Sequence, residues 1–434
     1  MGKGNEEIYH GIWWLPGSSK NIHGILKVED QSLATFETLD TFEKEGSHPF
    51  VGKSIKHECI FGLASSMLDN KEYSFRLYSL IEINVSSQVF TKIKFKVTRV
   101  LKGSANPNDS SNTFESVRLS SLFWKHWVKS KGLKKERLRY DKTKYGYKVE
   151  YRQPEAITLF KSEGTHVYIN FRANTSFNKE QDFVLVESPF LNFEFEGLKS
   201  IKEIILLKTS LERFFMILWE KAHQFDKFDM RSADGTDFEN VSPTQEPTTG
   251  WNTKYAFEEF TTNSQDLIQG WLTMAKEDRL VIDTFFFAFV DYKMAIENRF
   301  LNYLFALELY HRKKVRATQP LSKKNERMYN LTMETVKIGA VESWLKKVLN
   351  HERDISLKER LPELLNFIDN RKGISLNTDI ITRCVQTRHY LVHLDEKHAD
   401  KRFSAEELLK INDSLETLML RLLKKELFEC QMRG

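Results

Sequence analysis

The sequence predicts an α+β protein of more than one domain, with a β-rich N-terminal part followed by an all-α helical bundle. In the first half, apolar and polar residues alternate, as in Phe90–Val100, where Ile93 and Phe95 stand between lysines. This is the period-2 pattern of a half-buried strand. From about Leu198 onward, apolar residues recur every three or four positions, as in helices. The length of 434 residues also suggests more than one domain.

Further strands are predicted at Gly24–Glu29, Thr165–Phe171 and Phe183–Phe195. We expect Pro189 to divide the last of these into two pieces, because proline cannot donate to the ladder of a central strand. Several short strands separated by turns indicate an antiparallel sheet, sandwich or barrel.

A helix is predicted from Ile201 to about Ala222, and the stretch Asp226–Gly250, rich in Asp, Ser, Thr and Pro, predicts a linker. We therefore place a β-rich domain ending in a helix at residues 1–225, a linker at 226–254 and a helical domain at 255–434. The predicted helices of the last part begin near Glu258 and continue with Leu280–Tyr310 (one or two helices), Met328–Asn350, Leu357–Asn370, Asp379–Leu394 and Ala405–Glu429. Their short connections favour an up-down bundle.

The composition is that of a globular protein, with 41% hydrophobic and 29% charged residues. The net charge of +5 permits a nucleic-acid partner without requiring one. The three cysteines are far apart and form no CxxC pair, which argues against disulfides and structural zinc and favours a reducing cytosol. The N-terminus has no apolar signal-peptide core, and no apolar stretch is long enough to span a bilayer. We expect a cytoplasmic protein that does not engage a membrane.

The most informative segment is Arg388–His393 on the predicted helix Asp379–Leu394. The apolar stripe of this helix runs through Ile380, Ile381, Cys384 and Val385 and resumes at Leu391 and Val392. At 3.6 residues per turn, Arg388 stands where the stripe calls for an apolar residue. A charge in this position needs an acidic side chain, a subunit or a bound phosphate opposite it.

His389 and His393 are four residues apart and share one face of the helix. An arginine holds phosphate and a histidine transfers protons near neutral pH, so these residues could serve RNA cleavage. The alternatives are a snorkelling or ion-paired arginine and a solvated histidine face. A zinc site is weaker still, since the glutamate of HExxH is absent and His398 is the nearest spare ligand.

Two basic runs are candidates for RNA contact. The segment 124–148 interleaves cations with aromatic residues such as Trp124 and Trp127, which could hold a phosphate backbone and stack bases. The alternative is a solvated segment whose tryptophans belong to the core. A second run follows at 311–316. The candidate RNA-binding residues are Lys129, Lys134, Lys135, Arg137, Arg312 and Lys313. We find no Walker A loop, Rossmann fingerprint or GxSxG motif.

Arg388–His393 matches the R-polar-xxx-H signature of HEPN domains, with His389 in the polar position. Glu297–Glu308 resembles the first core helix of the ApeA-like HEPN family. Gly11–Pro16, followed by the strand that begins at Gly24, resembles the opening of the ApeA N-terminal domain. Arg383 and His389 also fit a longer HEPN spacing, but Arg388 and His393 are preferred because Arg388 interrupts the apolar stripe.

The resemblance implies an anti-phage, abortive-infection HEPN endoribonuclease that needs neither metal nor cofactor. Such enzymes use the ribose 2′-OH as nucleophile and leave a 2′,3′-cyclic phosphate and a 5′-OH. By resemblance, His393 would be the general acid or base, Arg388 would bind the scissile phosphate, and His389 would orient the substrate or assist proton transfer. Glu308 would hold the guanidinium of Arg388, unless it is an ordinary exposed carboxylate.

The resemblance further implies a homodimer through the HEPN domain, RNA substrates (tRNA being compatible with the family) and a phage-encoded trigger. The alternative function is a non-catalytic HEPN-type module that binds nucleic acid or a phage protein. A structural or antitoxin-like partner is a third.

Overall fold

The computed structural model describes residues 6–29, 34–38, 40, 42, 56–87, 91–105, 112–128, 132–139, 145–162, 164–177, 183–225, 227–241, 255–291, 293–316, 323–335, 355–394 and 396–431. The chain divides into two compact units. The N-terminal unit comprises residues 1–212 and 223–265, and the helical unit comprises residues 213–222 and 266–434.

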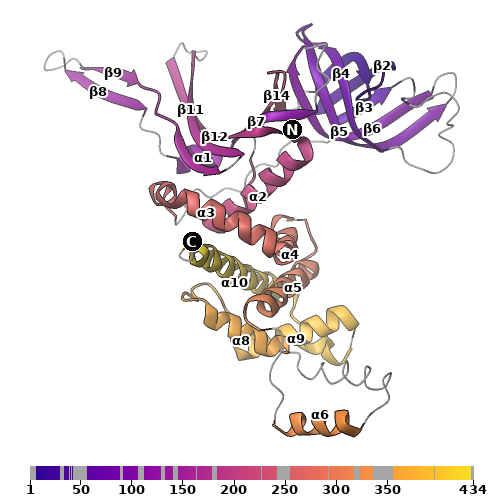
Figure 1. Cartoon of the computed structure of the whole chain (residues 1–434), viewed down its shortest axis with the longest axis vertical. Helices are drawn as coiled ribbons and strands as arrows, with labels where there is room; N and C mark the ends of the chain where they lie inside the picture. The colour runs from indigo at the N-terminus through magenta and orange to yellow at the C-terminus, as the bar shows by residue number, and fades with distance from the viewer. Residues whose placement is uncertain are drawn as a thin grey trace. The chain divides into compact units, whose positions relative to one another are not determined.

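In the described part of the N-terminal unit, antiparallel strands close into a barrel (Figure 1). The barrel strands are β1 (Glu6–Trp14), β2 (Asn21–Glu29), β3 (Ala34–Thr38), β4 (Lys56–Ser66), β5 (Glu72–Ser87) and β6 (Thr91–Ser104). They follow the order β6-β3-β2-β1-β4-β5, and β5 pairs back with β6. Trp13, Phe36 and Phe75 fill the interior. A Cβ on Gly62 would lie 2.1 Å from the Trp13 ring, so only glycine lets the indole lie against β4.

A second group of strands extends the sheet beyond the barrel, because β14 pairs with β6 at Leu101–Gly103, past the end of β3. The order continues through β14 (Asp237–Asn240), β13 (Lys227–Ser232), β7 (Thr113–Ser120), β12 (Phe183–Ser200), β11 (Thr165–Phe177) and β10 (Ile157–Ser162). One face buries residues such as Val117, Phe193 and Met230. Alternate residues, among them Arg118 and Asp229, form a polar face.

Two expectations for this region were wrong. β12 runs unbroken through Pro189, because its pairing with β7 begins only at Leu191 and Pro189 therefore has a single paired neighbour, Phe171. Part of the predicted linker 226–254 forms β13 and β14, while residues 242–254 lie outside the described residues. Strand β13 was not predicted because the alternating buried residues Phe228 and Met230 lie in a segment whose composition is typical of a loop.

The described part of the segment with the first basic run forms a short helix, α1 (Leu122–Trp127), and a separate two-stranded sheet of β8 (Leu133–Arg139) and β9 (Tyr145–Tyr151). Trp124 and Trp127 are buried, and Trp127 Nε1 donates to the Tyr255 carbonyl oxygen at 2.8 Å. They therefore belong to the core and are not available to stack bases.

Besides α1, the described helices are α2 (Ile201–Trp219), α3 (Phe257–Glu277), α4 (Arg279–Val290), α5 (Ile296–Lys314), α6 (Lys323–Thr335), α8 (Leu357–Phe367), α9 (Thr378–His393), the 3₁₀ helix η1 (Glu396–Lys401) and α10 (Ala405–Gln431). The predicted stretch Leu280–Tyr310 is two helices, α4 and α5. Of the predicted helix Met328–Asn350, residues 336–350 lie outside the described part of the chain. The expected succession of a β-rich region and a helical region is confirmed.

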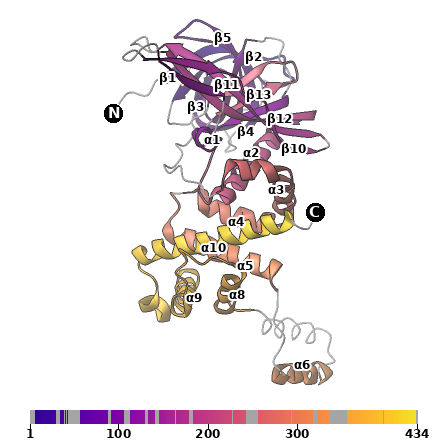
Figure 2. The ribbon, with the colours of Figure 1, turned by 90° about the vertical axis from the view of Figure 1, so that its left-hand side faces the viewer.

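Helix α5 is the centre of the helical unit and packs against α4, α8 and α10 (Figure 2). Its residues Phe300, Tyr303, Leu304 and Leu307 are fully buried. The Tyr303 hydroxyl donates to Glu416 of α10 at 2.7 Å. This packing fixes the rotation of α5 about its axis, and with it the direction of the remaining side chains. Within the described residues, no helix is both long and apolar enough to cross a membrane.

Candidate active site

Helix α9 carries the motif and has well-defined ends. The Asn377 side chain accepts a hydrogen bond from the Ile380 N–H at 2.9 Å, which caps the first turn. At the other end, Leu394 adopts a left-handed conformation with φ of 52°, and its N–H donates to the Tyr390 carbonyl oxygen. The motif residues therefore occupy the last turns of a capped helix, immediately before the chain reverses into η1.

The buried line of α9 runs through Ile381, Cys384 and Thr387. The expectation that position 388 lies on this line was off by one residue, or about 100° around the helix. Thr387 takes the buried position, where its hydroxyl oxygen accepts the Phe403 N–H at 3.0 Å. Val392, expected on the stripe, is 45% exposed. Arg388 accordingly lies at the edge of the helix–helix contact.

Arg388 forms a two-point ion pair with Glu308 of α5. Its Nη1 lies 3.1 Å from Glu308 Oε1 and its Nη2 lies 3.0 Å from Oε2. The guanidinium carbon is 5.4 Å from the centre of the Phe305 ring. The side chain of Arg388 is 30% exposed and that of Glu308 only 14%. The expected pairing is present, and it leaves three of the five guanidinium N–H donors for another ligand.

His389 and His393 lie on the exposed side of α9, with ring centres 5.8 Å apart. His398 of η1 stacks on His389, also at 5.8 Å and with 29° between the ring planes. From the sequence, His398 was expected only as a spare zinc ligand. The left-handed residue Leu394, which turns the chain back, is what brings it to His389. No group of three or more potential metal ligands is found among the described residues.

Arg383, the arginine of the longer HEPN spacing, is engaged differently. It forms a two-point ion pair with Glu407 at 2.8 and 3.0 Å and contacts the Lys401 and Arg402 carbonyl oxygens. Its guanidinium also lies 4.4 Å from the Phe403 ring. Its hydrogen bonds are the main cause that lowers the pKa of Glu407 to about 2. Arg383 thus holds the end of η1 and the start of α10 against α9 through these contacts.

The two basic residues near the end of α5 have different surroundings. Lys313 is ion-paired with the buried Asp278 at 2.6 Å. Arg312 is exposed, and within the described residues it has neither a hydrogen bond nor an ion pair. It lies four residues after Glu308, on the same face of the helix. Arg312 is therefore the freer cation beside the Arg388–Glu308 pair.

The first basic run is described only in part. Lys134 is exposed on β8 and stands opposite Glu150, while Glu136 stands opposite Lys148. Opposite charges across the two strands balance this face. Lys129 lies outside the described residues, as do the side chains of Lys135 and Arg137.

A buried polar network was missed by sequence reasoning, which treated His311 only as part of a basic run. His311 is fully buried; its Nδ1 lies 2.8 Å from Arg360 Nη1 and its Nε2 lies 2.9 Å from Glu363 Oε2. Arginine only donates, so Nδ1 accepts and the Nε2 proton goes to Glu363. Burial is the main cause that lowers the pKa of His311. The network joins α5 to α8 and supports the helix that carries Glu308.

Comparison with known proteins gives two family matches. Residues 8–257 match ApeA N-terminal domain 1, and residues 301–429 match the Apea-like HEPN family. No curated protein and no solved structure matches the chain. HEPN domains are generally ribonucleases that act on RNA and dimerise, and the ApeA-like group is associated with anti-phage defence. With both of these domains in this order, the chain belongs to the ApeA-like HEPN family.

Proposed function

We propose that the chain is an anti-phage HEPN endoribonuclease that cleaves RNA without a metal ion, through attack of a ribose 2′-OH on the adjacent phosphate. The observation that carries the proposal is the Arg388–Glu308 ion pair at the edge of α9, beside the exposed histidines. Glu308, whose side chain is only 14% exposed, holds the guanidinium of Arg388 in one orientation, as the binding of a phosphate requires.

In this proposal Arg388 binds the scissile phosphate. The carboxylate of Glu308 fixes the plane of the guanidinium, and the free N–H groups donate to the non-bridging oxygens. These donors stabilise the negative charge that grows on the phosphoryl oxygens as the 2′-oxygen attacks. Arg383 is a poor alternative for this role, because Glu407 and two backbone carbonyls already hold its guanidinium.

His393 transfers the protons. As a base it removes the proton of the 2′-OH, the 2′-oxygen bonds to phosphorus and the bond to the 5′-oxygen breaks. As an acid it delivers a proton to that leaving oxygen, so the products are a 2′,3′-cyclic phosphate and a 5′-OH. His389 orients the substrate or assists proton transfer, and His398 stacks on it and restricts its ring.

Two copies of the chain complete the site. HEPN domains typically dimerise, and apolar side chains are exposed around the motif. Phe305 is 36%, Val392 45% and Leu394 73% exposed. We propose that this face pairs with its counterpart in a second copy, which brings two sets of motif residues together. Light scattering of V392E and L394E variants tests this pairing, because they should be folded monomers with little activity.

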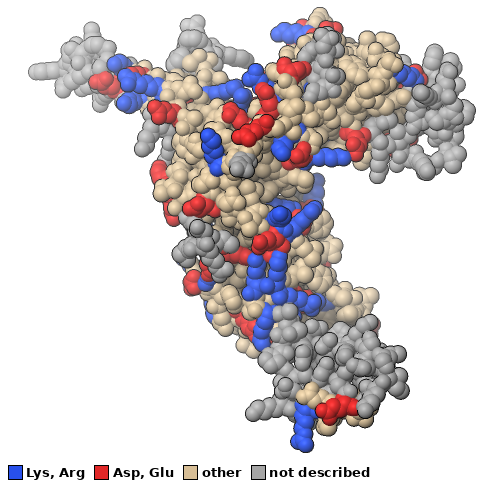
Figure 3. All heavy atoms as spheres, viewed as in Figure 1, with Lys and Arg blue, Asp and Glu red and all other residues tan. Residues whose placement is uncertain are grey.

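RNA would approach over basic surface beside the motif. Lys and Arg side chains gather over the helical part of the face shown in Figure 3. Arg312 is the described residue of the helical unit best placed to contact a phosphate next to the scissile one, and Lys134 of the N-terminal unit is a separate candidate. tRNA is a substrate to test first, and a phage-encoded component is the proposed trigger.

The test is phage protection and RNA cleavage by R388A and H393A variants of the full chain. Both variants should lose both activities. If both keep full activity, the catalytic assignment is wrong. If cleavage is absent in the wild type but RNA or a phage protein still binds, the chain is a non-catalytic binding module.

A further inference from the structure

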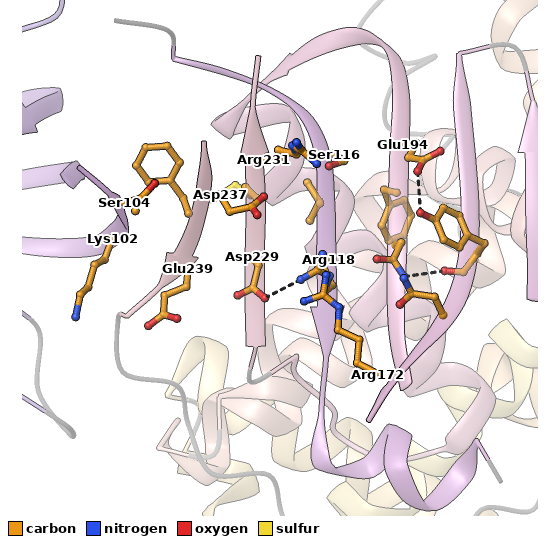
Figure 4. A pocket seen from close by; sticks show the side chains of 18 of the residues that line it. Lys102, Ser104, Ser116, Arg118, Arg172, Glu194, Asp229, Arg231, Asp237 and Glu239 are labelled. Atoms are coloured by element: carbon orange, nitrogen blue, oxygen red, sulfur yellow. Dashed lines mark hydrogen bonds and ion pairs between the residues drawn. The ribbon is translucent and has the colours of Figure 1, made fainter. Parts of the chain in front are cut away.

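The polar face of the extended sheet in the N-terminal unit is hollowed into a pocket of about 690 Å³ (Figure 4). Residues of strands β6, β14, β13, β7, β12 and β11 line it, and Arg118 and Asp229 are among its polar side chains. The volume lies within the range of sites for small molecules and cofactors. None of the residues proposed for RNA cleavage lines it, so it requires a separate explanation.

One half of the pocket is positively charged. Arg118 of β7 and Arg172 of β11 lie side by side (Figure 4), and their guanidinium carbons are 5.7 and 5.9 Å from the centre of the same ring, that of Phe190. Arg118 Nε is buried without a hydrogen-bond partner. Its nearest carboxylate oxygen, on Asp229, is 3.8 Å away. Arg172 has no carboxylate partner among the described residues.

Two adjacent guanidinium groups repel one another unless an anion lies between them. Burial, followed by the charge of Arg172, lowers the pKa of Arg118. Asn170 lies two residues before Arg172 on β11, and its amide oxygen is buried without a hydrogen-bond partner. Such unsatisfied groups are costly in a folded protein and indicate a missing ligand. The planar forks of two arginines suit the oxygens of a phosphate.

The other half of the pocket is negatively charged. Asp229 of β13 stands directly opposite Glu239 of β14, and Asp237 follows on the same face (Figure 4). Like charges directly opposite each other destabilise a sheet. Burial is the main cause that raises the pKa of Asp229. The carboxylates of Asp237 and Glu239 have no hydrogen bond or ion pair within the described residues. These carboxylates are placed to accept hydrogen bonds from a ligand that carries N–H donors.

We propose that this pocket binds a mononucleotide, with its phosphate between Arg118 and Arg172 and the N–H groups of its base toward Asp229 and Glu239. A long polyanion fits less well, because as many acidic as basic side chains line the pocket. Lys102 and Arg231 are already engaged, Lys102 with the Tyr9 hydroxyl at 2.8 Å and Arg231 with Glu115 at 3.2 Å. The remaining cations are Arg172 and Arg118, the latter 3.8 Å from Asp229, and they suit one compact anionic group.

Isothermal titration calorimetry of the full chain tests the proposal, with AMP, GMP, CMP and UMP as probes. Inorganic phosphate, guanosine, a zwitterionic Lys-Glu dipeptide and a short RNA are the comparison ligands. At least one nucleotide should bind at micromolar concentration, and its nucleoside should bind at least tenfold more weakly. R118Q/R172Q should weaken nucleotide binding at least tenfold. D229N/E239Q should weaken binding of the nucleotide but not of inorganic phosphate.

R231Q is the matched control, because Arg231 lines the same pocket but is paired with Glu115; its affinity should stay within twofold of the wild type. R172Q alone replaces an exposed side chain and keeps the test valid if the double variant does not fold. The proposal is overturned if no mononucleotide binds below 1 mM, if R172Q and R231Q have equal effects, or if the dipeptide or RNA binds more tightly. The assay measures binding alone, so its result is independent of the proposed RNA cleavage.

Discussion

Replacing Arg388 by alanine separates a structural from a catalytic role, because α9 offers a matched control in Arg383. Each arginine makes a two-point ion pair, and their side chains are 30% and 38% exposed. Exposed ion pairs contribute ~0.2–1 kcal/mol, and hydrogen bonds to charged groups up to ~3 kcal/mol. For this partly exposed pair with Glu308, we expect R388A to lower the free energy of unfolding by about 1 kcal/mol. R383A also removes contacts with two backbone carbonyl oxygens, so it should lower the free energy of unfolding at least as much.

The effects on activity should have the opposite order. Removing a donor that stabilises transition-state charge lowers the rate by about 10²–10³-fold. A loss of ~1 kcal/mol from a domain stable by ~5–15 kcal/mol leaves nearly all molecules folded, so instability cannot cause such a decrease. R388A should therefore lose about 10²–10³-fold in cleavage rate, while R383A stays close to the wild type.

The assay combines urea unfolding, followed by circular dichroism, with initial rates on a labelled RNA that the wild type cleaves. The reasoning is refuted if R383A loses as much activity as R388A. It is also refuted if R388A keeps its rate while its stability falls as expected, since Arg388 would then be a structural ion-pair partner only.

Three further outcomes are expected. E308Q keeps the shape of the carboxylate but frees the guanidinium of Arg388, so kcat should fall about tenfold with KM little changed; an equal change in KM would argue against a positioning role. Burial lowers the pKa of His223 to about 3, below its unfolded value of ~6.5, so the unfolded state takes up the proton first. Stability should be full above pH 6.5 and fall toward pH 3 by up to ~1.4 kcal/mol per pH unit, and less steeply in H223Q, as measured by urea unfolding. Burial raises the pKa of the Cys384 thiol to about 12, so mass spectrometry should find it unalkylated by iodoacetamide at pH 8 until the protein is unfolded.

The sequence predicted best where one local pattern determines the structure. The alternation around Phe95 correctly predicted a strand, and the helical period around Cys384 correctly predicted a helix. Each pattern depends on a single buried face. A partner for Arg388 was expected because a charge next to an apolar stripe needs one, and the family resemblance pointed to Glu308. The rotation of α9 was off by one residue, because Thr387 finds a hydrogen-bond donor in Phe403 that periodicity alone does not reveal.

Features that depend on distant neighbours were missed. Pro189 lies inside β12 because β7 does not pair with it there, and that depends on register between strands far apart in the chain. His398 meets His389 only through the left-handed turn at Leu394. Arg118 and Arg172 are separated in sequence and come together only when β7 and β11 flank β12.

The most direct test of the central claim is the chemistry of the RNA ends left after cleavage, mapped by sequencing in the presence of EDTA. The proposal predicts 5′-OH and 2′,3′-cyclic phosphate ends at the same rate with and without EDTA, and none from H393A. Ends carrying a 5′-phosphate, cleavage that strictly requires an added divalent metal, or unchanged cleavage by H393A would contradict it.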